Sequence, residues 1–316
     1  MIIDIFAHHI SARVSEMIAG GVYARHYRYP PQTADPQVRL ALMDKYGIDV
    51  QAVSQTAPVL MGLSPIDAAA VCRASNDDND ILCKAYPDRF VNIGMVSLLD
   101  MDEALRELDR CVNELDCRGI TVNTNQEDRG LDDPAFRPFY KKLVEHDLPL
   151  LMHPAHWGDY HLVDMDEGWR MMHIFGWPFD STQAVWRLIM GGVIDEFPDL
   201  KVVVHHMGAL LPYFEERIYS TFERHLKDRL PRHISEYWGN FYGDTAVDGT
   251  KAAYPCGYAF FGEDRLVFGT DYPFGTESGE AYVRDNLTGV RAMDLSPEIT
   301  DKILGGNAAK LLHLGV

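Results

Sequence analysis

The chain has 316 residues, and its composition, with 47% hydrophobic and 24% charged residues, is typical of a globular protein with a sizeable core. The 29 basic and 47 acidic residues give a formal net charge of −18. Such an acidic surface repels nucleic acid and anionic membranes, so neither is an expected partner. Because no basic leader precedes the first apolar run and no apolar stretch reaches the ~18 residues that cross a bilayer, we expect a cytoplasmic protein.

Short apolar runs alternate along the chain with stretches of helical periodicity, which is the pattern of βα units around a parallel sheet. The expected strands are the runs at 2–6 (IIDIF), 49–54 (DVQAVS), 90–96 (FVNIGMV), 119–123 (GITVN), 148–153 (LPLLMH), 201–206 (KVVVHH), 239–244 (GNFYGD) and 265–270 (RLVFGT). Helix starts are expected where a capping residue precedes proline, at Asp35-Pro36, Ser64-Pro65, Asp133-Pro134 and Ser296-Pro297.

This order of elements favours a single (β/α)8 TIM-type barrel over a doubly wound sheet with an extra domain. No stretch rich in proline, glycine and serine divides the chain, so residues 1–316 are expected to form one domain. Long loops follow the first strand, at 7–34, and the fifth strand, at 154–180. Both leave the C-terminal ends of strands, where barrel enzymes build their active sites, so each loop is expected to form a substrate lid, a subunit contact or both.

Four side chains with acid–base and metal-binding chemistry lie where expected strands end. They are His8, His153, His206 and Asp271, at strands one, five, six and eight. A single histidine in such a place is more often a core or loop residue, but strand ends converge in a closed barrel and would bring the four together. Three nitrogen or oxygen donors with one open position are what a catalytic zinc or manganese ion requires.

The alternation of side chains along a strand separates the two pairs of adjacent histidines. Phe6 and His8 share one face of the first strand, whereas His9 belongs to the other face unless the strand has already ended. The same argument separates His205 from His206. An aromatic ring at Phe6 therefore accompanies His8 on the inner face, where a metal-binding strand would be expected to carry another donor.

Five segments resemble the amidohydrolase superfamily, in particular its branch of aminocarboxymuconate-semialdehyde decarboxylase-like proteins, also called amidohydrolase family 2. The segments are MIID with His8, LPLLMHPA around His153, KVVVHHMGALLPYFEERI, LVFGTDYPFG around Asp271, and ILGGNAAKLL near the end. They span nearly the whole chain, and those of the sixth and eighth strands are the most specific. The resemblance implies a distorted (β/α)8 barrel with one divalent ion that decarboxylates aromatic or unsaturated acids, or in some members hydrates or hydrolyses its substrate.

The resemblance also implies roles for individual residues. His8 and His153 match metal ligands, and Asp271 matches the aspartate of the eighth strand, which is also a ligand. His206 matches a catalytic histidine of the sixth strand. Arg217, in FEERI, matches an arginine that faces the substrate carboxylate or its ring substituents.

Phe6 departs from the family pattern, which has histidine or glutamate at this position. Phenylalanine has no donor atom, so the resemblance implies three remaining protein ligands, His8, His153 and Asp271, for one zinc or manganese ion, and weaker binding of that ion. We place the Phe6 ring among the residues that contact substrate instead. His205 falls on a position that the family fills with small residues, so its implied role is packing.

The leading hypothesis is a metal-dependent, non-oxidative decarboxylation of an aromatic or unsaturated carboxylic acid. Arg217 would bind the carboxylate through two parallel hydrogen bonds. Asp271 or His206 would deliver a proton to the carbon that loses CO2. Arg25, in the first long loop, and Trp157, in the second, are further candidates for substrate contact.

Two alternatives stay open. Hydration or hydrolysis at the same pocket would use Asp271 and His206 as an acid–base pair and would not need a tightly held ion. A barrel that has lost its chemistry and serves as a binding protein is the third hypothesis, which Phe6 supports.

Aromatic residues gather in the second long loop. They are Trp157, Tyr160, Trp169, Phe175, Trp177 and Phe179. They are suited to the wall of a pocket for a flat substrate, and equally to a subunit interface, where aromatic residues are enriched. We therefore expect a homodimer or a higher homo-oligomer.

Overall fold

The structure is a computed structural model that describes residues 1–19, 34–155 and 171–315. Each expected strand run contains a strand or a pair of short strands. The strands are β1 (Ile3–His8), β2 (Val50–Ser54), β3 (Phe90–Asn92), β4 (Gly94–Met95), β5 (Ile120–Asn123), β8 (Leu150–His153), β9 (Val202–Val204), β10 (Phe241–Asp244) and β11 (Leu266–Val267). A small separate hairpin consists of β6 (Asn125–Gln126) and β7 (Arg129–Gly130).

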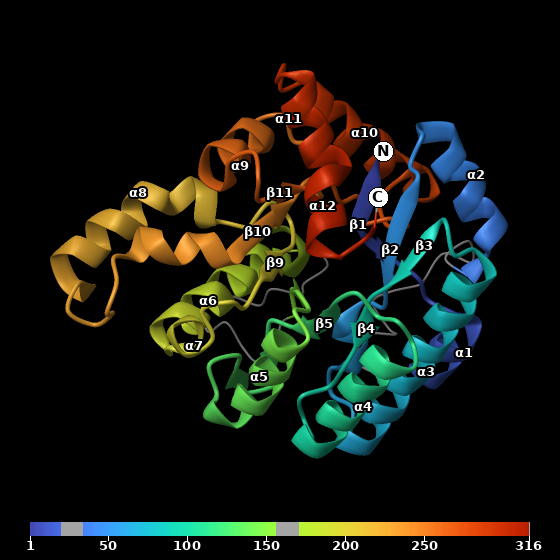
Figure 1. Cartoon of the computed structure of the whole chain (residues 1–316), viewed down its shortest axis with the longest axis horizontal. Helices are drawn as coiled ribbons and strands as arrows, with labels where there is room; N and C mark the ends of the chain where they lie inside the picture. Colours follow the sequence, from blue (N-terminus) through green and yellow to red (C-terminus); the bar gives the residue numbers. More distant parts are fainter. Residues whose placement is uncertain (20–33, 156–170, 316) are drawn as a thin grey trace.

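The strands form a ring in which neighbours run parallel (Figure 1). β1, β2 and β3 pair in this order, and β4, β5, β8, β9, β10 and β11 pair in chain order. Only Ile93 separates β3 from β4, so the chain itself links the two groups. The ring closes where the segment after β11 runs beside β1. There, Ile5 N donates to the Phe268 carbonyl at 2.9 Å and Asp271 N donates to the Phe6 carbonyl at 2.8 Å.

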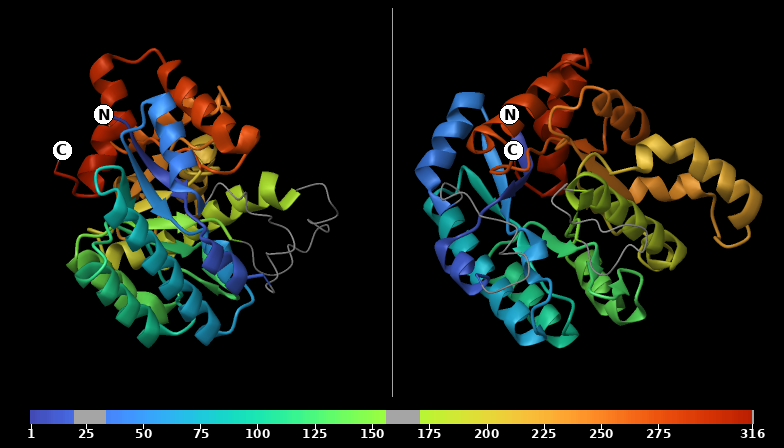
Figure 2. Two further views of the ribbon diagram at one scale, coloured as in Figure 1. Left: turned by 90° about the vertical axis from the view of Figure 1, so that its right-hand side faces the viewer. Right: turned by 180° about the vertical axis from the view of Figure 1, so that it is seen from behind.

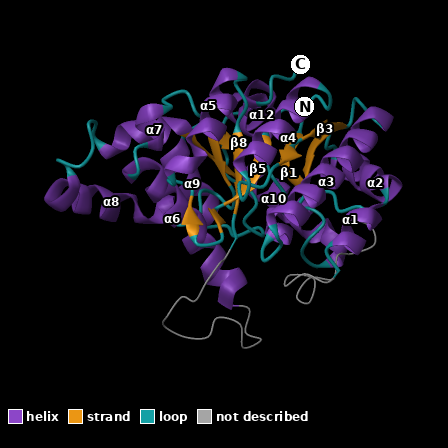
Figure 3. Ribbon diagram, turned by 90° about the horizontal axis from the view of Figure 1, so that it is seen from below, coloured by secondary structure: helices purple, strands orange, loops and turns teal. Residues whose placement is uncertain are grey.

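Helices cover the outside of the ring (Figure 3). They are α1 (Ala12–Met17), α2 (Pro36–Tyr46), α3 (Pro65–Ala85), α4 (Met101–Asn113), α5 (Arg137–Glu145), α6 (Trp177–Met190), α7 (Val193–Glu196), α8 (Leu211–Thr221), α9 (Ala253–Phe261), α10 (Glu280–Arg291), α11 (Pro297–Asp301) and α12 (Asn307–Leu311). Shorter 3-10 or π-helical turns lie at Ala57–Leu60, Pro134–Phe136, Met172–Gly176, Phe222–Leu226, Ile234–Asn240, Glu277–Gly279 and Lys302–Gly306. α8 extends away from the strands (Figures 1 and 2).

The four helix starts expected from a capping residue before proline are confirmed. Asp35, Ser64 and Ser296 precede α2, α3 and α11, and each side chain accepts a hydrogen bond from a backbone N–H in the first turn. Asp133 does the same for the 3-10 turn at Pro134–Phe136, which leads into α5. A capped start fixes where a helix begins, and therefore how long the loop from the preceding strand is.

Two layers of apolar side chains hold the ring together. Inside it, strand residues pack against one another and against α12. They include Ile5, Ala52, Ile93, Leu151, Val203 and Val267 from the strands and their ends, with Ala308 and Leu311 from α12. Outside the ring, a larger cluster fills the space between strands and helices. Because α12 lies against the starts of the strands, the N-terminal end of the ring is closed, and the polar residues at the C-terminal strand ends face the opposite side.

A buried carboxylate bridges the seam at which the ring closes. Asp4 of β1 is fully buried and accepts hydrogen bonds from Thr270 N at 3.0 Å, Thr270 Oγ1 at 2.6 Å and Gln51 Nε2 at 2.9 Å. Arg39 of α2, also buried, donates to Gln51 Oε1 at 3.0 Å and to the His8 carbonyl. These hydrogen bonds join α2, β2, β1 and the segment after β11, and we call them the seam network.

Parts of both long loops, at 20–33 and 156–170, lie outside the described residues. Within residues 1–19, 34–155 and 171–315, no helix combines the length and the apolar character needed to cross a membrane.

Asp4 makes the stability of the protein depend on pH. Burial raises the pKa of Asp4 to about 7, although the hydrogen bonds from Thr270 and Gln51 lower it. An aspartate in an unfolded chain has a pKa of ~4, so the folded state binds the proton more tightly. The stability that this group contributes is therefore fully present below pH ~4 and is lost as the pH rises through about 7.

We expect Asp4→Asn, which cannot titrate, to remove this dependence. Urea unfolding at a series of pH values from ~5 to ~8 should show that the free energy of unfolding of the parent falls relative to that of the variant, by about 1 kcal/mol per pH unit where Asp4 titrates. Asp102→Asn, at an exposed aspartate of α4, is the matched control and should follow the parent. Parallel curves for the parent and Asp4→Asn would contradict the assignment.

Candidate active site

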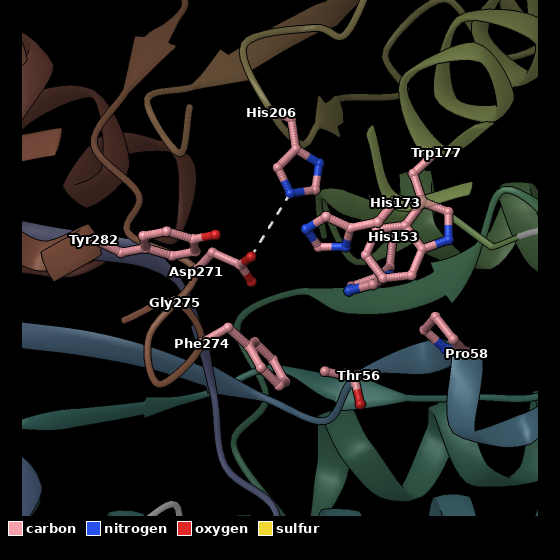
Figure 4. Close-up of a pocket in the computed structure, with 10 residues that line it drawn as sticks. All are labelled: Thr56, Pro58, His153, His173, Trp177, His206, Asp271, Phe274, Gly275 and Tyr282. Atoms are coloured by element: carbon pink, nitrogen blue, oxygen red, sulfur yellow. Dashed lines mark ion pairs between the residues drawn. The ribbon is translucent and has the colours of Figure 1, made fainter. Parts of the chain in front are cut away.

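A pocket opens at the C-terminal ends of the strands (Figure 4). Its described lining residues are Thr56, Pro58, His153, His173, Trp177, His206, Asp271, Phe274, Gly275 and Tyr282. Counted with the opening to solvent, its volume is about 690 Å³. Its described walls are aromatic and imidazole rings with one carboxylate, and none of these lining residues is arginine or lysine.

Asp271 lies at the centre of the polar groups. It has a φ of 61° and follows β11 at the point where the chain leaves the seam. Its Oδ1 lies 3.1 Å from His8 Nε2, and its Oδ2 lies 3.8 Å from His206 Nε2. Burial raises the pKa of Asp271, but the His206 and His8 imidazoles outweigh burial and bring the pKa below its ordinary value. Asp271 is therefore ionised at neutral pH.

His206 reaches the pocket because β9 ends early. The strand ends at Val204, and His206 has a φ of 60° in the turn that follows. Asp244, at the end of β10, holds this turn, since its Oδ1 accepts a hydrogen bond from His206 N at 3.0 Å and its Oδ2 from His205 Nδ1 at 2.5 Å. Strand alternation predicted opposite faces for the two histidines. Both rings instead lie near Phe6, because the strand has ended before them.

The two imidazoles at the ends of β8 and β9 differ in their readiness to bind a proton. Burial lowers the pKa of His206, but the Asp271 carboxylate outweighs burial and raises the pKa overall. Burial, and then His8, lower the pKa of His153 well below its ordinary value. His153 Nδ1 lies 2.8 Å from the Pro154 carbonyl oxygen, to which it donates, so its Nε2 carries a lone pair. His206 is thus suited to carry a proton, and His153 to bind a cation.

Phe6 fills the centre of the imidazole cluster. Its ring centre lies 3.6–5.8 Å from those of four histidines, His8, His153, His205 and His206. It stacks on His205, with ring planes 14° apart. The register of β1 against β2 shifts between Asp4 and Ala7, yet Phe6 and His8 face the same cluster, as alternation predicts. With 1% exposure, Phe6 lies behind the described lining and not in it.

Among the other predicted substrate contacts, only Arg217 lies in the described residues, and the structure does not bring it to the pocket. Arg217 is exposed on α8, with its guanidinium carbon 5.9 Å from the ring centre of Phe214, and it does not line the pocket. The reason is that α8 extends away from the ring of strands (Figure 2). Arg25 and Trp157 lie outside the described residues.

Six of the described lining residues had no predicted role in the pocket, namely Thr56, Pro58, His173, Phe274, Gly275 and Tyr282. Phe274 comes three residues after Asp271, in a segment that the family resemblance had already singled out. His173 lies next to Trp177, with ring centres 4.7 Å apart, and Tyr282 lies on α10. No local motif marks His173 or Tyr282, so the sequence offered no signal for them.

The donors suit a divalent ion by their chemistry but do not enclose one. In the described part of the chain, the buried His8 Nε2 has no aligned hydrogen-bond partner, although Asp271 Oδ1 is 3.1 Å away. The ring centres of His8 and His153 lie 5.3 Å apart, close to the ~5 Å expected of two imidazoles bound ~2 Å from one ion. No three His, Cys, Asp or Glu side chains among the described residues form a complete site, however, and Phe6 adds no donor.

Comparison with known proteins identifies the family and several relatives of this chain. The family described as Amidohydrolase matches residues 3–314. A 2-amino-3-carboxymuconate-6-semialdehyde decarboxylase from Dictyostelium discoideum is 28% identical over 313 residues, which cover 97% of this chain and 84% of that protein. A gamma-resorcylate decarboxylase from a Rhizobium species is 32% identical over 257 residues, which cover 75% of this chain and 76% of that protein.

Comparison with solved structures finds the same fold in a related decarboxylase. The crystal structure of 5-carboxyvanillate decarboxylase from Novosphingobium aromaticivorans, complexed with manganese and 4-hydroxy-3-methoxy-5-nitrobenzoic acid, matches this chain with a TM-score of 0.88 at 27% identity and covers 99% of this chain and 96% of that one. The α/β fold is thus that of amidohydrolase-type decarboxylases. Since the family pattern also spans nearly the whole sequence, the chain belongs to the amidohydrolase family, in the branch of the aminocarboxymuconate-semialdehyde and gamma-resorcylate decarboxylases.

Proposed function

We propose that the protein is a carboxy-lyase that decarboxylates an aromatic acid without an oxidant. The observation that carries this proposal is the pair of Asp271 and His206, with Oδ2 and Nε2 3.8 Å apart, at the wall of a pocket lined mainly by aromatic and imidazole rings. The relatedness to gamma-resorcylate decarboxylase supports it. The proposal includes one (β/α)8 barrel domain over residues 1–316, with long loops after β1 and β8.

The pocket suits a flat ring. Figure 4 shows Tyr282 on one side of the pocket and Trp177 with Pro58 on the other, with Asp271 and His206 between the two sides and Phe274 below Asp271. Aromatic and proline side chains provide apolar contact area, and burying the substrate ring against them favours binding.

The pair can supply the proton that the reaction needs. In decarboxylation the bond between the ring carbon and the carboxylate breaks, CO2 leaves, and the electron pair stays on the ring carbon, which then takes up a proton. His206 and Asp271 face the pocket with Nε2 and Oδ2 3.8 Å apart, and His206 is the member suited to carry a proton, so the pair can deliver that proton to the carbon and regain one from water.

A divalent ion would be held by His8, His153 and Asp271, with zinc and manganese as the candidates. The manganese in the related 5-carboxyvanillate decarboxylase supports this choice of cofactor. When bound, such an ion polarises substrate oxygens and stabilises negative charge. Because Phe6 supplies no donor, we propose that this chain holds the ion with three protein donors, and less tightly than a four-donor site would.

The other predicted contacts and the subunit number stay proposals. Arg25 and Trp157 remain candidates for substrate binding from the long loops. For the homodimer, the support in the described residues is an exposed apolar surface at the start of α6 and the turn before it, where Ile174, Phe175 and Phe179 are 46–62% exposed. Light scattering in solution measures the number of subunits.

Removing either member of the catalytic pair should abolish most of the activity. We expect Asp271→Asn and His206→Ala each to lower kcat at least ~100-fold, because a positioned proton donor contributes ~10²–10⁴-fold. The assay is CO2 release from a panel of hydroxybenzoic acids, with the ring product identified by mass spectrometry. His146→Ala, at an exposed histidine after α5, is the matched control and should retain full activity.

The same assay separates the alternative reactions. Consumption of an acid without CO2 release would contradict decarboxylation and favour hydration or hydrolysis at this pocket. Binding of an acid without any turnover, by the parent as well as the variants, would favour a binding protein.

Phe6 should determine how tightly the ion is held. After purification without chelator and extended dialysis, we expect elemental analysis to find less than one divalent ion per chain in the parent and close to one in Phe6→His, because the variant supplies a fourth donor beside His8. Phe6→Leu, which supplies none, is the matched control and should resemble the parent. A full equivalent of ion in the parent, with the same affinity as in Phe6→His, would contradict the three-donor proposal.

A further inference from the structure

A second cavity lies at the N-terminal end of the ring, opposite the candidate active site. Its described lining comes from the end of α3, from β3 and the segment before it, from the segment between α4 and β5, and from the tail after α12. Its apolar wall consists of Pro87, Phe90, Val91, Leu115 and Leu314. Counted with the opening to solvent, its volume is about 780 Å³. A ligand here would leave the active-site pocket open.

Asn92 places an unpaired acceptor in the wall of this cavity. Along β3, Phe90 packs with the cluster outside the ring and Val91 with the cluster inside it, so alternation directs Asn92 outward. The Asn92 side chain is 3% exposed, and its Nδ2 donates to the Leu115 carbonyl at 3.3 Å, which fixes the orientation of the amide. In the described part of the chain, its buried Oδ1 has no hydrogen-bond partner. Such an oxygen destabilises the fold, and a ligand that donates a hydrogen bond would satisfy it.

Negative charge exceeds positive charge in the lining. The Asp80 carboxylate is paired with Lys84 Nζ at 2.7 Å. The Asp116 carboxylate is paired with Arg118 Nη2 at 2.9 Å. The third carboxylate, that of Glu114, has no ion-pair partner among the residues that the structure describes. The helices α3 and α4 both end beside the cavity, and the last carbonyls of a helix carry partial negative charge. The cavity therefore favours a cation over an anion.

Cys83 adds a neutral thiol to the lining. Burial, and then the Asp80 and Asp116 carboxylates, raise the pKa of Cys83 to about 12. The side chain therefore stays protonated near pH ~7 and is a poor nucleophile. Its sulfur provides polarizable contact surface for an apolar ligand. The chemistry of the cavity is that of a binding site and not of a second reaction centre.

We propose that this cavity is a second ligand site, which binds a small organic amine in its protonated form. The ammonium group donates a hydrogen bond to Asn92 Oδ1, and a hydrogen bond from a charged donor is stronger than one from a neutral donor. The apolar part of the amine packs against Pro87, Leu115 and Leu314. The Glu114 carboxylate and the two helix ends stabilise the positive charge. The inference concerns a different site from the proposed decarboxylation and does not depend on it.

Two probes with the same ring test the inference. The dissociation constants of 4-fluorobenzylamine, which is protonated at pH ~7, and 4-fluorobenzyl alcohol are measured by fluorine NMR titration. We expect the parent to bind the amine about fivefold more tightly than the alcohol. Asn92→Leu, which removes the acceptor at similar size, should weaken binding of the amine at least about tenfold. Asn113→Leu, at an exposed asparagine of α4, is the matched control and should bind as the parent does.

Two outcomes of this titration overturn the inference. One is a parent that does not bind the amine, as expected if water alone satisfies Asn92. The other is undiminished binding by Asn92→Leu, once circular dichroism has verified that this variant folds.

Two further variants keep the test independent of the folding of Asn92→Leu. Leu314 lies in the partly exposed tail after α12, where Leu314→Trp fills the cavity and should exclude both probes. Glu114→Gln should weaken binding of the amine about twofold to threefold and leave that of the alcohol unchanged. Glu298→Gln, at an exposed glutamate of α11, is its matched control. Parental affinity for both probes in Leu314→Trp contradicts the proposed site.

Asp271→Asn separates this site from the active-site pocket, whose carboxylate also attracts a cation. Because Asp271 lies at the other end of the ring, we expect Asp271→Asn to bind the amine as the parent does. Loss of binding in Asp271→Asn, with binding retained in Asn92→Leu, would assign the amine to the active-site pocket and overturn the inference.

Discussion

The seam network around Asp4 is the constraint on which the rest of the site depends. A buried carboxylate destabilises a fold unless hydrogen bonds satisfy it. Asp4 finds its donors where β1, β2 and the segment after β11 meet, at Gln51 and Thr270. Asp4 therefore receives all of these hydrogen bonds only when the ring of strands is closed. Because Asp271 follows Thr270 directly, the position of the Asp271 carboxylate is set by hydrogen bonds made one residue earlier.

A second buried carboxylate, Asp244, holds the turn after β9 by accepting hydrogen bonds from it. Asp4 holds the seam of the ring in the same way. Asp244 accepts hydrogen bonds from the backbone of His206 and from the ring of His205. His206 and Asp271 both have positive φ values, near 60°, which side-chain-bearing residues seldom adopt and which persist where the surroundings hold them. The two members of the proposed catalytic pair thus lie just after strand ends in a strained backbone conformation, and hydrogen bonds to a buried aspartate hold the backbone beside each of them.

The sequence predicted the strands because a barrel strand is buried on both faces and leaves a short continuous apolar run. His153 and Asp271 were predictable for the same reason, since they come at or after the ends of such runs. Tyr282 and His173 were not, because each is a single residue on a helix or its first turn, and its direction depends on packing between distant segments. Arg217 shows the reverse case. Its segment predicted a substrate contact, but the direction of α8, which no local pattern encodes, leaves it exposed.

The charge of the pocket bears on the direction of the proposed reaction. A substrate carboxylate beside Asp271 meets a like charge, and no arginine or lysine balances it within the described lining. Departure of neutral CO2 removes that repulsion, while the burial of the ring, ~25 cal/mol per Å² of apolar surface, is unaffected by it. Interactions remote from the reacting bond can therefore hold the substrate while the bond breaks. Binding through the ring and reaction through the carboxylate together allow an acidic pocket to act on an acid.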